Sequence, residues 1–170
     1  MITTDDAAMA ERLRRLRNHG ATYDGATWEF PTVGGNYRLT EMQGAIGAVQ
    51  MRKLDALLTR RRGLAQLYDA ALSPLDWLRI PRYPEGTRAV FQSYVVLLDP
   101  AVDRAHVMTA LRQRDIESTI PTYAVPLTQY YRTKYGHRAG DFPVAERIYR
   151  HGLALPLHAA MHDDDVASVA

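Results

Sequence analysis

The chain of 170 residues contains no cysteine, so disulfides, thiolate metal sites and a cysteine nucleophile are excluded. It also lacks any run of about 18 apolar residues, the length that a membrane-spanning helix needs. Its first residues, MITTDDAAMAERL, carry acidic side chains where a signal peptide carries basic ones. We therefore expect neither export nor membrane insertion, and we predict a cytoplasmic location.

The chain also lacks a strong excess of one charge, since 21 Lys and Arg residues face 19 Asp and Glu residues. Arginines nevertheless cluster at 12–17 and at 60–62, and clustered arginine can neutralise nucleic-acid phosphates. In the first cluster Leu13 and Leu16 lie among the arginines at helical spacing, which is typical of the solvated side of an amphipathic helix. We predict no nucleic-acid partner; the alternative, a basic nucleic-acid-binding domain, predicts an affinity that falls steeply with salt.

Familiar catalytic patterns are missing as well. The sequence contains no glycine-rich phosphate loop of the form GxxxxGK[ST] and no Ser, His and Asp set at a recognisable spacing. His158 and His162 are four residues apart, but a metal site needs three or four convergent ligands. We therefore predict no metal site.

What is present indicates a folded protein with two different halves. Apolar residues make up 46% and charged residues 24%, as in soluble globular proteins. In the first half, Asp5 and Asp6 precede a helical pattern that stops at Gly20, and 20–35 is expected to be an irregular connection. A long helix is expected from Glu41 to about residue 73, with Thr40 and a glutamine three residues later forming a capping box.

After residue 74 the pattern changes to short strands and helices. Residues 78–80 and 90–98 are rich in β-branched and aromatic side chains and predict strands, and 116–123 predicts a further extended segment. Helices are expected to begin after Asp103, at Pro143 and at 163–165. The whole indicates an α/β fold, or α+β for this portion, with a helical first half joined to a small helix-and-strand second half.

Asn36 and Arg38 stand immediately ahead of the predicted long helix. An amide donor and a guanidinium fork beside a helix N-terminus would suit a phosphate or a carboxylate. Alternatively, the asparagine caps a turn and the arginine is a surface charge. Tyrosines farther along leave two interpretations open, since they could line a polar pocket or cover a small sheet; they are at positions 123, 130, 131 and 135.

Three phrases together resemble the sugar aminotransferase family called DegT/DnrJ/StrS, of the pyridoxal-phosphate fold type I. They are MITTDDAAMAERLRRLRNHG, NYRLTEMQGAIGAVQMRKLD and GDFPVAERIYRHGLALPLH, and they follow the family's order over nearly the whole chain. The resemblance implies the C-terminal portion of that fold. It implies a remnant of the large cofactor-binding domain at 1–40, a long linking helix at 41–73 and a C-terminal small α/β domain at 74–170.

The resemblance also implies an activity, the pyridoxal-phosphate-dependent transamination of nucleotide-linked keto sugars in deoxyamino-sugar, polysaccharide or antibiotic-sugar biosynthesis. In the family a lysine holds the cofactor as a Schiff base, in a segment before a phrase that resembles the start of this chain. The two lysines present, Lys53 and Lys134, lack that context. We therefore expect an incomplete chain that has no catalytic lysine and is inactive alone.

For the cofactor, the resemblance implies that Asn36 donates to the phosphate group of the pyridoxal phosphate in a neighbouring subunit. It implies that Arg38 contacts an anion at the same shared site. It implies a homodimer, a nucleotide-sugar substrate and an amino-acid amino donor. The alternative is a non-catalytic interaction or dimerisation module derived from the family. Either way, a long helix without the rest of its fold is expected to expose its apolar side and to promote aggregation or non-native dimerisation.

Overall fold

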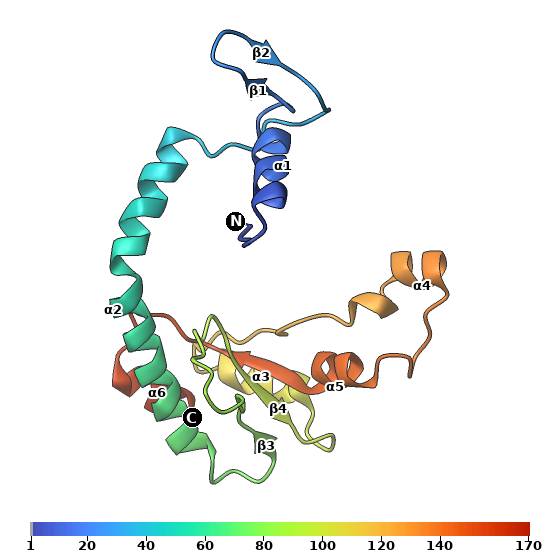
Figure 1. The fold of residues 1–170 in the computed structure, drawn as a ribbon. Helices are drawn as coiled ribbons and strands as arrows, with labels where there is room; N and C mark the ends of the chain where they lie inside the picture. The colour runs from blue at the N-terminus through green and yellow to red at the C-terminus, as the bar shows by residue number, and fades with distance from the viewer. Residues whose placement is uncertain (1) are drawn as a thin grey trace. The chain divides into compact units, whose positions relative to one another are not determined.

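The computed structural model describes residues 2–170, and the chain divides into two compact units between Lys53 and Leu54. Each unit is described by itself, and Figure 1 labels their elements. The mixture of helices and short sheets confirms the α/β or α+β expectation. Among residues 2–170, no helix has both the length and the apolar character needed to cross a bilayer.

The first unit begins with helix α1, Ala7–Arg17, as the sequence predicts. The helix starts where it does because the carboxylate of Asp6 accepts hydrogen bonds from the backbone N–H groups of Ala8 and Met9, at 2.8 and 3.0 Å. It ends at Asn18, and Gly20 follows with φ +76°, a left-handed conformation that glycine adopts without strain.

The connection after α1 is more ordered than the sequence indicates. Strands β1, Thr22–Tyr23, and β2, Trp28–Glu29, form an antiparallel hairpin within the segment expected to be irregular. The carboxylate of Asp24 accepts the N–H groups of Thr27 and Ala26, which closes the turn and lowers the pKa of that carboxyl.

Helix α2, Glu41–Leu72, runs from the first unit into the second. The capping box is confirmed, since Gln43 N–H donates to Thr40 Oγ1 at 3.2 Å and Thr40 N–H donates to Gln43 Oε1 at 3.0 Å. The last turns of α2 are buried, but its first turns are not: Met42 is 77% and Ile46 64% exposed. The expected exposure of an apolar side is therefore confirmed.

The second unit is built on a three-stranded antiparallel sheet in the order β3-β4-β5. Its strands are β3 Leu78–Arg79, β4 Tyr94–Leu98 and β5 Gly152–Leu155. The predicted strand 90–98 is too long, because Phe91 has φ +46° and interrupts the extended backbone. The expected extended segment 116–123 makes a single bridge, from Thr119 to Ala154 of β5, and β5 itself was not predicted.

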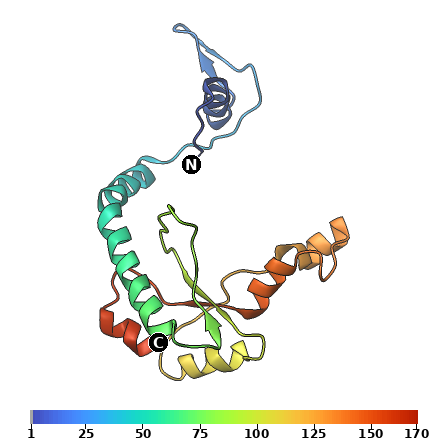
Figure 2. The same cartoon turned by 60° about the horizontal axis from the view of Figure 1, so that its bottom comes forward.

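Helices α3 Arg104–Arg112, α5 Pro143–His151 and α6 Asp163–Val169 begin where the sequence predicts. The 3-10 helix η1, Val125–Leu127, leads into α4, Gln129–Tyr135. Figures 1 and 2 agree that α4 extends away from the sheet of its own unit. The segment around α4 is therefore an exposed projection of the second unit.

The core of the second unit joins the end of α2 to the sheet. Tyr68 of α2 and Tyr94 of β4 are fully buried, with their rings stacked at a centroid distance of 4.8 Å. Their hydroxyl groups are both satisfied, because Tyr68 donates to Pro156 O at 2.9 Å and Tyr94 donates to Asp69 at 2.5 Å. The remaining core is aliphatic; it includes Leu64, Leu72, Val96, Leu98, Leu153, Leu155 and Val166.

Candidate functional site

The loop at 33–38 lies against the C-terminal end of α1. An isolated antiparallel bridge pairs Asn36 with Asn18, the residue that ends the helix. Three backbone hydrogen bonds hold the loop, each between 2.9 and 3.0 Å: His19 N–H to Gly35 O, Gly35 N–H to Leu16 O, and Tyr37 N–H to Arg17 O. The backbone on both sides of Asn36 is therefore fixed to α1.

Two glycines make this close approach possible. A Cβ atom added at Gly34 would lie 2.2 Å from the backbone N of Gly20. A Cβ atom added at Gly20 would lie 1.8 Å from the carbonyl oxygen of Thr32, and the positive φ of Gly20 adds a second constraint. Both obstacles are backbone atoms, so no side-chain movement could relieve them.

Asn36 and Arg38, the two residues assigned from the sequence, are brought together. Arg38 Nε donates to Asn36 Oδ1 at 3.0 Å, and both residues are exposed. The remaining N–H groups of the guanidinium and the Nδ2 group of the amide are all donors, a chemistry that matches the oxygens of a phosphate monoester. The pair can therefore hold an anion on the surface of the first unit.

The start of α2 contributes less to this site than the sequence suggests. The capping box already satisfies the N–H of Gln43, and Glu41 places a negative charge in the first turn. The anion-binding potential therefore lies in the two loop side chains rather than in the helix N-terminus.

The two lysines of the chain lie on helices rather than in this loop. Lys53 is 12 residues beyond Glu41 on the same helix, about 18 Å along its axis at about 1.5 Å per residue. Lys134, in the second unit, donates from Nζ to Tyr130 Oη at 2.9 Å and lies over the rings of Tyr130 and Tyr135, each at 5.3 Å. Its ammonium is therefore held by its own helix.

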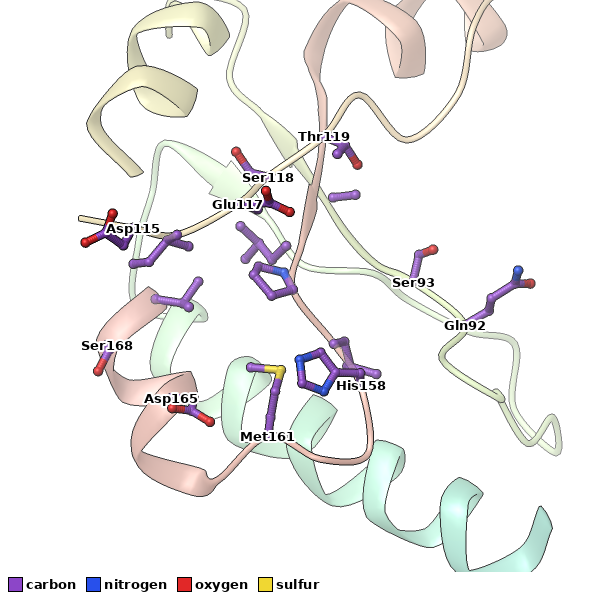
Figure 3. A pocket seen from close by; sticks show the side chains of 16 residues that line it. Gln92, Ser93, Asp115, Glu117, Ser118, Thr119, His158, Met161, Asp165 and Ser168 are labelled. Carbon is purple, nitrogen blue, oxygen red and sulfur yellow. The ribbon is translucent and has the colours of Figure 1, made fainter. Parts of the chain in front are cut away.

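The second unit contains a separate open pocket of about 620 Å³, shown in Figure 3. The segment 115–119 lies on one side and α6 on another, with His158 and Met161 at the base of the view. The hydroxyl of Ser118 is buried without a hydrogen-bond partner. The pocket is lined by polar, charged and apolar side chains, and no three of its described His, Asp or Glu residues are grouped so that they could hold a metal ion.

His162 and the arginines at 60–62 have structural roles. No group of three His, Asp or Glu side chains that could hold a metal occurs in the described part of the chain, and His162 is the N-cap of α6. In the cluster 60–62, Arg61 donates to Phe91 O at 2.9 Å and Arg62 to Ala89 O at 3.0 Å, while Arg60 pairs with Asp163 at 2.8 Å. These arginines anchor loops of their own unit.

Three of the four tyrosines do not cover the sheet, and their lining of a polar pocket stays a prediction. Tyr130, Tyr131 and Tyr135 are exposed or partly exposed on α4 and pack on one another, continuing into His137 and Phe142. They do not cover the sheet, because α4 extends away from it.

Sequence reasoning missed the contact between Gly20 and Gly34 and the hydrogen bond between Arg38 and Asn36. The first leaves a trace in the sequence, since glycine is the residue that tolerates both a positive φ and a close backbone contact. The second leaves none, because two polar residues two positions apart are common in any loop.

Comparison with known proteins agrees with this fold. The family described as the DegT/DnrJ/EryC1/StrS aminotransferase family matches residues 1–170. The chain is 34% identical to GDP-perosamine synthase of Caulobacter vibrioides, covering 99% of this chain and 45% of the relative. It is 33% identical to UDP-N-acetyl-3-dehydro-alpha-D-glucosamine 3-aminotransferase of Acidithiobacillus ferrooxidans, covering 100% and 44%.

Among solved structures, S. venezuelae DesV in complex with a ketimine intermediate is 30% identical with a TM-score of 0.87, covering 98% of this chain and 43% of that one. The chain thus spans less than half the length of the relatives that it matches, and its fold corresponds to that part of a fold type I sugar aminotransferase. The chain belongs to the DegT/DnrJ/EryC1/StrS aminotransferase family.

Proposed function

We propose that this chain forms part of a pyridoxal-phosphate-dependent aminotransferase that acts on a nucleotide-linked keto sugar. In the overall reaction an amino acid such as glutamate gives up its amino group and leaves as a 2-oxo acid, while the keto carbon of the sugar becomes an amine. The observation that carries the proposal is the donor pair Asn36 and Arg38, held at 3.0 Å from each other within a family of sugar aminotransferases.

Asn36 and Arg38 would hold the phosphate of the cofactor. Their free groups are donors, and a phosphate monoester offers acceptors and negative charge, so the residues present fit this group. When bound, pyridoxal phosphate supplies the electron sink that allows the amino group to move between carbons. The contribution of this chain is to bind and orient the phosphate end.

The proton-transferring lysine would come from outside this chain. Lys53 and Lys134 lack the sequence context of the family's lysine, and the ammonium of Lys134 contacts two tyrosine rings and a hydroxyl of its own helix. We propose that the site is completed by a segment that carries the lysine and by a second subunit in a homodimer. Within that arrangement 1–40 would belong to the large domain, 41–73 would be the linking helix and 74–170 the small domain, in a cytoplasmic enzyme.

A complementation experiment tests the proposal. The chain is mixed with the lysine-bearing portion of GDP-perosamine synthase, pyridoxal phosphate, glutamate and a nucleotide-linked keto sugar, and the amino sugar is measured by mass spectrometry. We expect product with the wild-type chain and a marked loss with Asn36→Ala. An Arg12→Met chain is the control, since that exposed arginine lies on α1 outside the loop.

A lysine-mapping experiment tests the second part. The chain alone is incubated with pyridoxal phosphate and reduced with borohydride, and its peptides are analysed. We expect no preferential adduct at either lysine. A stoichiometric adduct at Lys53 or Lys134 would show that the chain carries its own Schiff-base lysine.

The exposed apolar side of α2 favours a second candidate function, a non-catalytic dimerisation module. Met42 and Ile46 are more than half exposed, and Val49 continues the same stripe at helical spacing. Concentration-dependent association without any cofactor-dependent activity after complementation would favour this alternative.

A further inference from the structure

We propose that Arg38 is a positioning residue that orients the side-chain amide of Asn36, so that both of its N–H groups face an incoming phosphate. This inference rests on the proposed phosphate role of Asn36. It concerns one hydrogen bond within the first unit, from Arg38 Nε to Asn36 Oδ1.

The chemistry of arginine determines which way the amide points. A guanidinium carries donors and no acceptor, so the amide atom that faces Arg38 Nε at 3.0 Å is the oxygen. The Nδ2 group is therefore turned away from the arginine. With Arg38 removed, the amide could rotate and present its oxygen, which would repel an anion.

Because the surrounding backbone is fixed, the rotation of the Asn36 side chain is the main motion left at this site. The N–H groups of Gly35 and Tyr37, on either side of Asn36, donate to the end of α1, and Gly34 lies against Gly20. Because the loop is held in this way, the orientation of the Asn36 amide depends on its own side-chain contacts. Arg38 supplies the one that the structure shows.

Arg38 also keeps donors available after making this contact. Nε is used by Asn36, and the two terminal nitrogens remain to meet a second phosphate oxygen. The arrangement is therefore a donor surface made of one amide and one guanidinium, in which the arginine has two tasks.

The test uses the full 170-residue chain and follows the Asn36 side chain by NMR. The relaxation of its Nδ2 group reports rotational freedom, and titration with inorganic phosphate reports binding. In Arg38→Met, which keeps an apolar stem and removes every donor, we expect the Nδ2 group to become mobile while the backbone amides of 35 and 37 stay unchanged. We expect phosphate affinity to fall by roughly tenfold or more, since the direct charged contact of Arg38 is lost as well, so the mobility of Nδ2 is the readout that reports positioning.

Arg12→Met is the matched control, because it removes the same charge from an exposed position on α1. It should leave Asn36 rigid, and it should change phosphate affinity only through the loss of one distant positive charge. Asn36→Asp is a second variant: its carboxylate would pair with Arg38, present no donor and repel an anion, so the phosphate response at this loop should weaken.

The outcomes separate this inference from the proposed function. An Nδ2 group that is equally rigid in wild type and Arg38→Met overturns the positioning role, regardless of the result of the phosphate titration. A rigid wild-type amide that becomes mobile in the variant supports the positioning role. If phosphate then shifts no resonance of Asn36 or Arg38 in the wild type, the positioning stands and the phosphate role fails.

Discussion

At the scale of single residues, the site depends on two glycines that have no Cβ atom. Gly34 and Gly20 meet backbone to backbone, and this contact lets the loop at 33–38 hydrogen-bond to the end of α1. Residue 34 must lack a Cβ atom because the backbone of residue 20 is too close. Residue 20 must lack one because the backbone of Thr32 is too close, and it must also adopt a positive φ. The two glycines therefore support the backbone around Asn36 through their contact with each other.

We predict that Gly34→Ala releases the loop. The added methyl group would overlap the backbone N of Gly20, which cannot move without disturbing α1. Hydrogen exchange at the amides of Gly35 and Tyr37 should accelerate, and the first unit should lose roughly 2 kcal/mol. Gly47→Ala is the control: its added Cβ meets nothing within 4 Å, so helix propensity should stabilise α2 by about 1 kcal/mol. Unchanged exchange in Gly34→Ala would contradict the contact.

Two buried tyrosines make stability depend on pH on the alkaline side. Burial raises the pKa of Tyr68 to about 12, and burial together with the hydrogen bond to Asp69 raises the pKa of Tyr94 further. The unfolded chain releases these protons near the ordinary value of about 10. Above that pH the folded state binds more protons than the unfolded state, so the free energy of unfolding falls as pH rises.

Urea titrations of the second unit's unfolding at pH 8 and at pH 11 check this expectation. Wild type should be less stable at pH 11. Tyr94→Phe should be less stable than wild type at pH 8, since Asp69 loses its partner, but should lose less on going to pH 11. An equal loss in both proteins would rule out Tyr94 as a source of the pH dependence.

At the scale of elements, local signals predicted where α1, α2, α3, α5 and α6 begin, whereas α4 was not predicted. Asp6 and Asp103 cap α1 and α3, and the Thr40 and Gln43 pair caps α2, because each signal acts within three residues of the chain. The strands were harder. The residues of β5 pair with β4 across a long stretch of chain, and β5 begins directly at Gly152, the C-cap of α5, with no separate loop.

The site divides in the same way. The sequence identified Asn36 and Arg38 as candidates, and the structure brings them together. The sequence could not indicate that Gly20 and Gly34 are in contact, because that contact depends on how the intervening hairpin returns the chain to α1.

We predict that Arg60 holds α6 in place. Its guanidinium bonds to the Asp163 carboxylate at 2.8 Å and to the carbonyl of Met161, just ahead of the helix. Arg60→Met should accelerate hydrogen exchange in α6 selectively and lower the stability of the second unit by about 1 kcal/mol. Arg52→Met, on an exposed part of the same helix, is the control. Equal exchange in α6 of both variants would show that the contact is dispensable.

At the scale of the whole molecule, the apolar stripe at the start of α2 is expected to govern association. Met42, Ile46 and Val49 recur at helical spacing and are all exposed. We predict concentration-dependent self-association in sedimentation, reduced by Ile46→Glu and retained by Ala48→Glu, which adds the same charge at an exposed position about 200° around the same helix from Ile46. A wild-type chain that is monomeric at all concentrations would contradict this expectation.

The pairing of β4 with β5 also decides the order in which the second unit can be made. β4 is an apolar strand, YVVLL. One of its neighbours, β3, precedes it in the chain, but the other, β5, follows only after residues 99–151. During synthesis β4 must wait with one edge unpaired until β5 has left the ribosome, and closing so long a loop slows folding further. The newly made chain is therefore most vulnerable in that interval, when a chaperone that shields a single apolar strand would raise its yield.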